Sequence, residues 1–170
     1  KHKGVTAFLV DPKQTTGITI ADFPMRTLKR DNLAEVHFEN AFVPDETVLG
    51  EPGGGFPVLG SALDTGRFSV ASRQVGQAQR ALDLALPYAG GRKAFGQAIG
   101  EFQLIQQKIT DMTCRVQQAR NAVYQLGRMK DAGIERCSME SWMAKILASE
   151  AAVQNVLDSM QVFGGYSVNE

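Results

Sequence analysis

The pattern of apolar and polar positions divides the chain into a short β-rich part and a longer helical part. Three short runs of β-branched and aromatic residues, at 5–10, 17–20 and 33–39, alternate with segments rich in turn-forming residues. From about residue 56 onward, apolar positions recur at the three- and four-residue spacing of helices. The sequence therefore predicts strands before about residue 50 and helices after it.

The first expected helix runs from about Phe56 to Leu86. Pro87 follows directly, and proline in a helix removes a backbone hydrogen bond and crowds the preceding turn. We therefore expect this helix to end early or to kink at Pro87.

Two further helices are expected after a glycine-bounded turn. One spans roughly residues 101–131 and stops at Gly133, and the other begins at Ser138, a residue type that suits an N-cap, and ends at Gly164 and Gly165. Three long helices in succession predict an antiparallel, up-and-down bundle.

Strands followed by helices, with little alternation, predict a segregated α+β fold. The glycine-rich stretch LGEPGGGF at 49–56 is the expected boundary, which places a β domain in residues 1–52 and a helical domain in residues 53–170. Because the β part is short and would have unpaired strand edges, we expect the chain to be a piece of something larger.

Composition narrows the classes of function. Eighteen Lys and Arg balance eighteen Asp and Glu, so no broad field of one sign favours nucleic acid or an anionic membrane. Cys114 and Cys137 lack the spacing of a zinc site or disulfide scaffold, and no metal site is expected. The sequence has no run of about 18 apolar residues, so no membrane span is expected. We expect the protein to lie in a reduced compartment, either a cytoplasm or an organelle matrix.

The segment RKAFG at 92–96 is the most informative candidate site. The Arg92 guanidinium could bind a phosphate, and the Phe95 ring could stack on a base. A solvated helix end would explain the cations equally well, but it would not explain Phe95. Gln103 lies one or two helical turns from this basic loop.

Three other motifs each allow two interpretations. GEPGGGF is either a domain hinge or a phosphate cradle, because consecutive backbone N–H groups can bind an anion. The Lys-Ser or Lys-Thr that follows the glycines of a P-loop is missing here. Asp64 and Arg67 form a simple i,i+3 pair, or Asp64 positions Arg67 for a polar ligand. QVFGG at 161–165 is a helix terminus, or Gly165 allows a ligand to approach the backbone.

Taken in order, six motifs resemble the second half of an acyl-CoA dehydrogenase: FLVDPKQTTGI, VHFENAFVP, LGEPGGGF, LDTGR, RKAFGQAIGEFQLIQQKITDM and QVFGGYSVNE. The resemblance covers essentially all 170 residues. It implies that residues 1–52 are the latter part of a middle β-barrel domain. Residues 53–170 would be most of a C-terminal four-helix bundle.

The resemblance also implies an FAD site completed across a subunit interface. Arg92 matches the residue that reaches the pyrophosphate of FAD held by a neighbouring subunit, and Phe95 matches one near its adenosine half. The resemblance therefore implies a homodimer or homotetramer. The other positions that match lining residues of the same cofactor are Ile99, Phe102, Gln103, Gln161 and Gly165.

The implied reaction is α,β-dehydrogenation of a saturated acyl-CoA, with electrons passed to an electron-transfer flavoprotein. Asp64 and Arg67 match positions that meet the pantetheine and adenine portion of acyl-CoA. Gly66 occupies the place where some members carry the catalytic glutamate, so we expect the base beyond Glu170 and assign no catalytic residue here.

Two alternatives to this implied reaction stay open. An acyl-CoA oxidase or a flavin monooxygenase of the same superfamily would share the bundle. A flavin-free oligomerisation or binding module would also be consistent with the missing base. The implied location is a bacterial cytoplasm or a mitochondrial or peroxisomal matrix.

Overall fold

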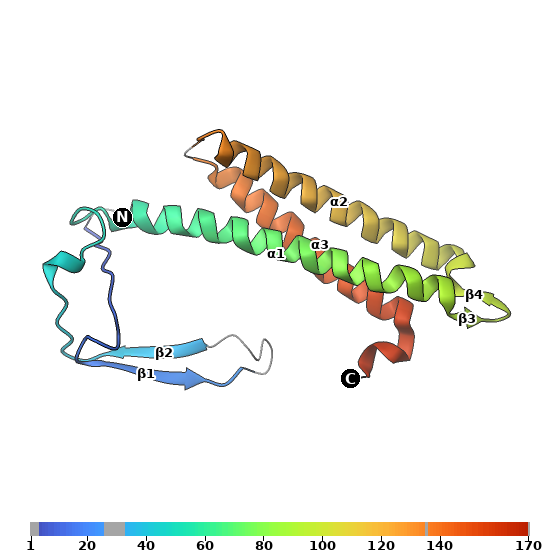
Figure 1. Cartoon of the computed structure of the whole chain (residues 1–170), viewed down its shortest axis with the longest axis horizontal. Helices are drawn as coiled ribbons and strands as arrows, with labels where there is room; N and C mark the ends of the chain where they lie inside the picture. The colour runs from blue at the N-terminus through green and yellow to red at the C-terminus, as the bar shows by residue number, and fades with distance from the viewer. Residues whose placement is uncertain (1–3, 26–32, 135, 170) are drawn as a thin grey trace. The chain divides into compact units, whose positions relative to one another are not determined.

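The computed structural model of the chain describes residues 4–25, 33–134 and 136–169. It divides into two compact units, residues 1–61 and 62–170, and the first helix runs across the division. Figure 1 labels the long helices α1 (Gly55–Gly91), α2 (Gln103–Asp131) and α3 (Ser138–Phe163), and the strands β1 (Ile18–Phe23), β2 (Leu33–Phe38), β3 (Lys93–Ala94) and β4 (Gln97–Ala98). The short 3-10 helices are η1 (Asp45–Thr47), η2 (Ile99–Glu101) and η3 (Gly164–Val168). The α+β class is confirmed, whereas the domain boundary at residue 52 stays a prediction.

In the first unit, β1 and β2 form an antiparallel pair in which Ile18 lies opposite Phe38. The strands expected near 17–20 and 33–39 are confirmed. The strand expected at 5–10 was wrong, because this run makes only isolated bridges, from Val5 to Gly54 and from Phe8 to Val48. Its β-branched residues favour extended backbone, but it passes two separate segments rather than one partner strand.

The glycine-rich joint before α1 is a close crossing of two backbone segments. The Gly53 N–H donates to Thr6 Oγ1 at 3.0 Å, and the Gly55 N–H donates to the Val5 carbonyl at 2.8 Å. A Cβ on Gly55 would lie 2.6 Å from the Ala7 nitrogen, so only glycine fits there. Because these two N–H groups already have partners within the chain, the phosphate-cradle interpretation loses its support.

Helix α1 continues past Pro87 to Gly91, so the expected early end at that proline was wrong, whereas a kink there stays a prediction. Pro87 and Asp83, whose carbonyl loses its usual helical partner, both lie on the exposed face of the helix. Water can therefore satisfy the freed carbonyl. On the opposite face Ala85 and Ala89 are buried and hold the last turns against the core.

The helix ends were only partly predicted. Gly133 and Gly164 have positive φ values of 74° and 60° and follow α2 and α3 as expected. Ser138 is not the N-cap of α3, because Cys137 occupies that position without a side-chain capping bond. The Ser138 hydroxyl instead donates to Asp64 of α1.

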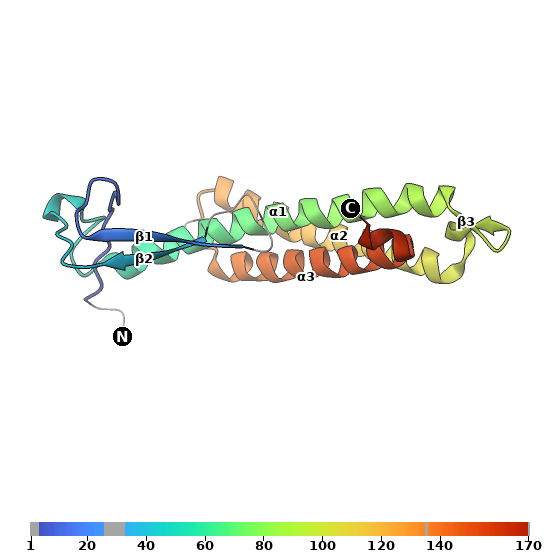
Figure 2. The same cartoon turned by 90° about the horizontal axis from the view of Figure 1, so that it is seen from below.

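Small side chains form much of the core of the helical unit. Figures 1 and 2 show α2 and α3 running antiparallel alongside each other, with α1 beside them. Because alanine has no long side chain, neighbouring helices can pack closely, and the few polar contacts between them fix their register. The buried alanines of α1 and α3 are Ala71, Ala78, Ala81, Ala85, Ala89, Ala144, Ala148, Ala151 and Ala152.

Candidate functional site

A β-hairpin with a two-residue turn connects α1 to α2 and contains most of the basic segment RKAFG. Strands β3 and β4 pair Lys93 with Ala98 and Ala94 with Gln97, which leaves Phe95 and Gly96 as the turn. Both turn residues have positive φ, 52° for Phe95 and 87° for Gly96, as a type I′ turn requires. The sequence indicated a turn here, but it did not indicate paired strands.

Phe95 is an unusual choice for this turn. A bulky residue in the left-handed region costs about 1–3 kcal/mol, and asparagine or glycine would avoid most of that cost. The side chain is 98% exposed, so burial in its own chain does not compensate. Its only ring contact among the described residues is with Phe102, edge-on at a centroid distance of 6.4 Å. The hairpin therefore holds an aromatic ring outward, available to a group outside the chain.

Arg92 is fixed through its backbone and free at its side chain. Its N–H donates to the Tyr88 carbonyl at 2.8 Å, and its carbonyl accepts from the Ile99 N–H at 2.8 Å. The side chain is exposed, and within residues 4–25, 33–134 and 136–169 its guanidinium has no hydrogen bond or ion pair. An anchored arginine with an unused charge suits the binding of an external anion such as a phosphate.

The remaining residues predicted from QAIGEFQ lie directly after the hairpin. Ile99 begins η2 and packs against the buried core, while Gln103 is the exposed first residue of α2. Gly100 passes close to α1, since a Cβ there would lie 3.0 Å from the Ala89 carbonyl oxygen. The structure therefore joins Arg92, Phe95, Ile99, Phe102 and Gln103 in one continuous surface segment.

The end of α3 reaches the same end of the bundle. The ring of Phe163, the last residue of α3, lies 4.2 Å from the Tyr88 ring of α1, centroid to centroid, at an interplanar angle of 31°. Gln161 and Gly165, two residues to either side of Phe163, are both exposed. Gly164, with φ of 60°, provides the helix terminus, and nothing in the described chain lies within 4 Å of a Cβ added at Gly165. The helix terminus therefore explains Gly164 but leaves Gly165 free for a ligand from outside.

A hollow of about 490 Å³ lies at the base of the hairpin, between the end of α1 and the start of α2. Leu86, Ile105 and Ile109 give it an apolar wall, and Glu101 and Gln106 add polar groups. The Gln106 side-chain amide donates to the Gly100 carbonyl at 3.1 Å, which ties α2 to the segment after the hairpin. This end of the bundle therefore combines a hollow with an exposed ring and with an arginine that has no side-chain partner among the described residues.

Asp64 and Arg67 lie at the other end of the bundle. Arg67 Nη1 donates to Asp64 Oδ1 at 3.1 Å, as the simple pairing predicts, and Ser138 Oγ donates to Asp64 Oδ2 at 2.7 Å. The guanidinium carbon also lies 5.8 Å from the centroid of the Trp142 ring. From Arg67 to Gly91 the axis of α1 rises about 36 Å, at 1.5 Å per residue. One copy of the chain therefore does not bring the two predicted sites together.

A buried polar network joins all three helices, and our sequence analysis did not identify it. Asn155 of α3 is fully buried, and its side-chain nitrogen donates to the carbonyls of Ala78 on α1 and Met112 on α2. Arg115 Nη1 donates to Asp158 Oδ2 at 2.6 Å and to Asn155 Oδ1 at 3.3 Å. An asparagine among alanines on the apolar stripe of α3 was the signal in the sequence.

Asp158 is the charged centre of this network. Lys108 Nζ also donates to it, at 2.9 Å. Burial alone would raise the pKa of Asp158, but hydrogen bonds and charge attraction from Arg115 and Lys108 outweigh it and lower the pKa below 3.8. The carboxylate therefore stays ionised and holds α2 against α3.

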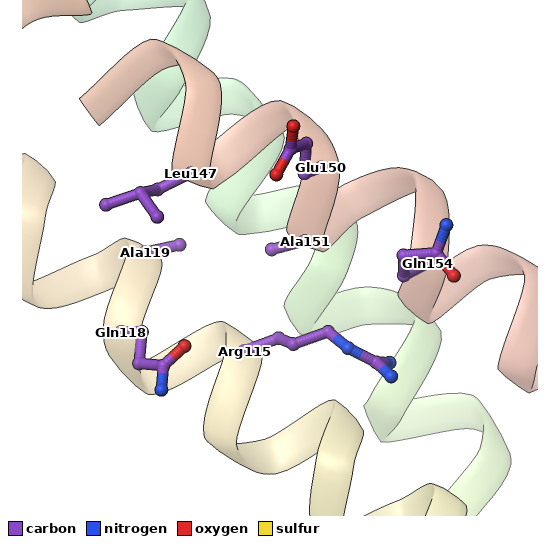
Figure 3. A pocket seen from close by; sticks show the side chains of 7 residues that line it. All are labelled: Arg115, Gln118, Ala119, Leu147, Glu150, Ala151 and Gln154. Atoms are coloured by element: carbon purple, nitrogen blue, oxygen red, sulfur yellow. The ribbon is translucent and has the colours of Figure 1, made fainter. Parts of the chain in front are cut away.

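A smaller hollow of about 220 Å³ lies between α2 and α3 beside this network. Figure 3 shows Arg115 extending along it, with Leu147 opposite Ala119. The Arg115 charge is already paired with Asp158, so among the described residues this groove offers no unpaired cation comparable to Arg92. The other side chains that line it are Gln118, Glu150, Ala151 and Gln154.

Two further properties concern the described residues only. They contain no helix that is long and apolar enough to cross a membrane. They also contain no group of three His, Cys, Asp or Glu side chains placed to hold a metal ion.

Comparison with known proteins identifies the family. The family model for the C-terminal domain of acyl-CoA dehydrogenases matches residues 53–170. This chain belongs to the acyl-CoA dehydrogenase family. The resemblance carried by the six sequence motifs is thereby confirmed.

The similar curated proteins are longer than this chain. The mitochondrial short-chain specific acyl-CoA dehydrogenase of Bos taurus is 39% identical over 165 residues, which are 96% of this chain and 40% of that protein. The acyl-CoA dehydrogenase of Bacillus subtilis is 38% identical over 164 residues, 96% of this chain and 43% of that protein. The chain thus spans about two fifths of the length of these relatives.

Several solved structures share the fold of this chain. Glutaryl-coenzyme A dehydrogenase in its glutaryl-CoA complex matches with a TM-score of 0.93 and 33% identity, over 97% of this chain and 42% of that one. PigA with FAD and proline matches with a TM-score of 0.94 and 32% identity, over 99% of this chain and 44% of that one. The prolyl acyl carrier protein oxidase AnaB matches with a TM-score of 0.94 and 30% identity, over 99% of this chain and 44% of that one.

Proposed function

We propose that this chain forms part of an FAD-dependent acyl-CoA dehydrogenase that converts a saturated acyl-CoA thioester to the 2,3-enoyl-CoA. Family membership and relatives named acyl-CoA dehydrogenase support this proposal. Residues 1–52 would complete a middle β-barrel domain, and residues 53–170 would supply most of a C-terminal bundle. The proposed location is a bacterial cytoplasm or a mitochondrial or peroxisomal matrix, since the relatives include bacterial and mitochondrial enzymes.

The observation that carries the proposal is the hairpin at the end of α1. It pairs an anchored arginine that has no partner among the described residues with an aromatic ring held outward at positive φ. These are the two chemistries that an adenine dinucleotide needs: a cation for the pyrophosphate and a flat apolar face beside the adenosine. PigA, which shares the fold, is described with FAD.

The other site residues fit the same cofactor. Gln103 and Gln161 offer amide groups for hydrogen bonds, and Gly165 leaves room for close approach to the backbone. Ile99 and Phe102 supply apolar contact at the base of the hairpin. In this arrangement Arg92 would hold the pyrophosphate, and Phe95 would lie against the adenosine half.

The separation of the two predicted sites supports a homo-oligomer. Arg67 and the hairpin lie at opposite ends of α1, so a substrate held at Arg67 and an FAD held at Arg92 would not meet in one copy. A symmetric dimer, or a tetramer of two such dimers, would place the hairpin of one subunit against FAD carried by its partner.

The chain's own residues have a limited part in the chemistry. Arg67, positioned by Asp64, would hold a polar group of the CoA portion of the substrate. Gly66 cannot act as a base, so we place the base glutamate that removes the α-proton beyond Glu170. When bound, FAD would accept the β-hydrogen as a hydride at flavin N5. An electron-transfer flavoprotein is the proposed acceptor of the electrons.

A specific comparison favours a second candidate function. AnaB, named as a prolyl acyl carrier protein oxidase, matches 99% of this chain with a TM-score of 0.94. The alternative is therefore a flavin oxidase of the same superfamily, in which oxygen accepts the electrons.

An anaerobic titration of the full-length protein with a panel of acyl-CoA thioesters would test the proposal. We expect one thioester to bleach the oxidised flavin band without oxygen. Slow reoxidation in air would favour the dehydrogenase, whereas rapid reoxidation with release of peroxide would favour the oxidase. A yellow protein that no thioester bleaches would exclude the proposed substrate class. A colourless protein that cannot be reconstituted with FAD would point to a flavin-free binding module.

A further inference from the structure

We propose that Tyr88 is a positioning residue for the FAD-binding end of the bundle and that it acts through its ring contact with Phe163. This inference rests on the proposed function, because it assigns a role in holding the same cofactor. Tyr88 would not touch FAD. It would fix the spacing between Arg92 on one side and Gln161 and Gly165 on the other.

Tyr88 connects directly to both sides of the site. Its carbonyl accepts the Arg92 N–H at 2.8 Å, so the position of its backbone sets where the hairpin begins. Its ring lies 4.2 Å from the Phe163 ring, and Phe163 immediately precedes the Gly164 terminus. One side chain therefore ties the end of α1 to the end of α3.

The last turn of α1 needs such a contact. Pro87 removes one backbone hydrogen bond from the helix just before Tyr88. The hydrogen bonds that attach α1 to α3 elsewhere, from Ser138 to Asp64 and from Asn155 to Ala78, lie ten or more residues before Tyr88. The buried side chains of Ala85 and Ala89 on these turns are short, so loss of the ring contact would leave the end of α1, and Arg92 with it, less firmly placed.

The ring, rather than the hydroxyl, carries this role. Within the described ranges the Tyr88 hydroxyl has no hydrogen-bond partner. Replacing tyrosine by phenylalanine would keep the ring contact, whereas leucine would remove it and keep an apolar side chain. Phe68 offers a matched control, because it is a half-buried aromatic residue on α1 that packs near Gly127, far from the hairpin.

The test measures the dissociation constant of FAD for the full-length protein and the variants Y88F, Y88L, F163L, Y88L/F163L and F68L. We expect Y88F to bind as the wild type does, and Y88L and F163L each to weaken binding about 3- to 10-fold, the range expected for one aromatic pair. The double variant should bind no more weakly than Y88L alone, because the two residues share one contact. F68L should lower the unfolding temperature without changing the affinity for FAD.

A second cycle separates positioning from general stability. If Tyr88 acts through the placement of Arg92, Y88L should cost little further affinity in an R92A background. Equal losses of affinity in Y88L and F68L, or an unchanged affinity in Y88L, would overturn the positioning role alone. A wild-type protein that binds no FAD would instead overturn the proposed function, and this inference with it.

Discussion

Ser138, the first residue of α3, donates a hydrogen bond from its hydroxyl to Asp64 Oδ2 of α1 across 2.7 Å. The same carboxylate pairs with Arg67, so a helix start that was expected to cap itself instead positions a candidate substrate contact. The bond joins residues 74 positions apart in the sequence and closes the end of the bundle away from the hairpin.

Ser138→Ala should lower the free energy of unfolding by about 1–2 kcal/mol, because a half-buried carboxylate loses a hydrogen-bond donor. It should also raise the KM for acyl-CoA with little change in kcat, since Asp64 would hold Arg67 less firmly. Urea unfolding and steady-state kinetics measure the two effects. Ser149→Ala is the matched control, because within the described part of the chain the Ser149 hydroxyl bonds only to the Ile146 carbonyl of its own helix. Equal stability of S138A and the wild type would contradict this prediction.

Phe95→Asn should stabilise the protein and weaken FAD binding at the same time. Asn-Gly is the preferred type I′ turn, so relief of the left-handed phenylalanine should add about 0.5–1 kcal/mol to the free energy of unfolding of the FAD-free protein. The loss of the ring should raise the FAD dissociation constant. Thermal unfolding and FAD titration of the same variant measure both changes. If F95N binds FAD as tightly as the wild type, the ring has no role in holding the cofactor.

Asp158→Asn should destabilise the bundle at neutral pH by about 2–3 kcal/mol, because it leaves the half-buried Arg115 and Lys108 without their anion. The pKa of Asp158 is lower in the folded protein than its ordinary value of 3.8. The carboxylate therefore stabilises the fold fully above about pH 4, and this contribution is lost as the pH falls through the lower, folded-state pKa.

Unfolding by urea at a series of pH values tests whether the stability that Asp158 contributes is lost as the pH falls. The difference in stability between the wild type and D158N should shrink as the pH falls below about 4. Asp111→Asn serves as the control, since Asp111 has no ion pair in the part of the chain that the structure describes. A wild-type advantage that persists unchanged at low pH would mean that the Asp158 charge does not hold α2 to α3.

Local sequence signals predicted the helical unit well because helices depend on nearby residues. The periodicity and the stop signals at Gly133 and Gly164 placed two helix ends correctly. The predicted early end at Pro87 was wrong because the cost of a proline depends on exposure: Asp83, whose carbonyl loses its helical partner, lies on the outer face, while Ala89 is buried on the inner one. The helix-breaking propensity of proline takes no account of which face of the helix the proline lies on.

Contacts between distant segments were the least predictable part. The run at 5–10 has strand composition, but its bridges depend on Gly54 and Val48, about 40 or more residues away. The Asn155 network likewise needs carbonyls from two other helices. At the candidate site, composition indicated Arg92 and Phe95, whereas the left-handed turn and the contact of Tyr88 with Phe163 required the three-dimensional arrangement.

The most direct test of the proposed FAD site is the FAD dissociation constant of the full-length protein carrying Arg92→Ala, measured beside Arg73→Ala, an exposed arginine elsewhere on α1. Loss of a charge-assisted contact of about 1.5–3 kcal/mol predicts roughly 10- to 150-fold weaker binding in R92A. R73A should bind as the wild type does, and the FAD-free R92A protein should unfold as the wild type does, because the Arg92 side chain has no partner within the described chain. An FAD affinity in R92A equal to that of R73A would contradict the assignment of this end of the bundle to FAD.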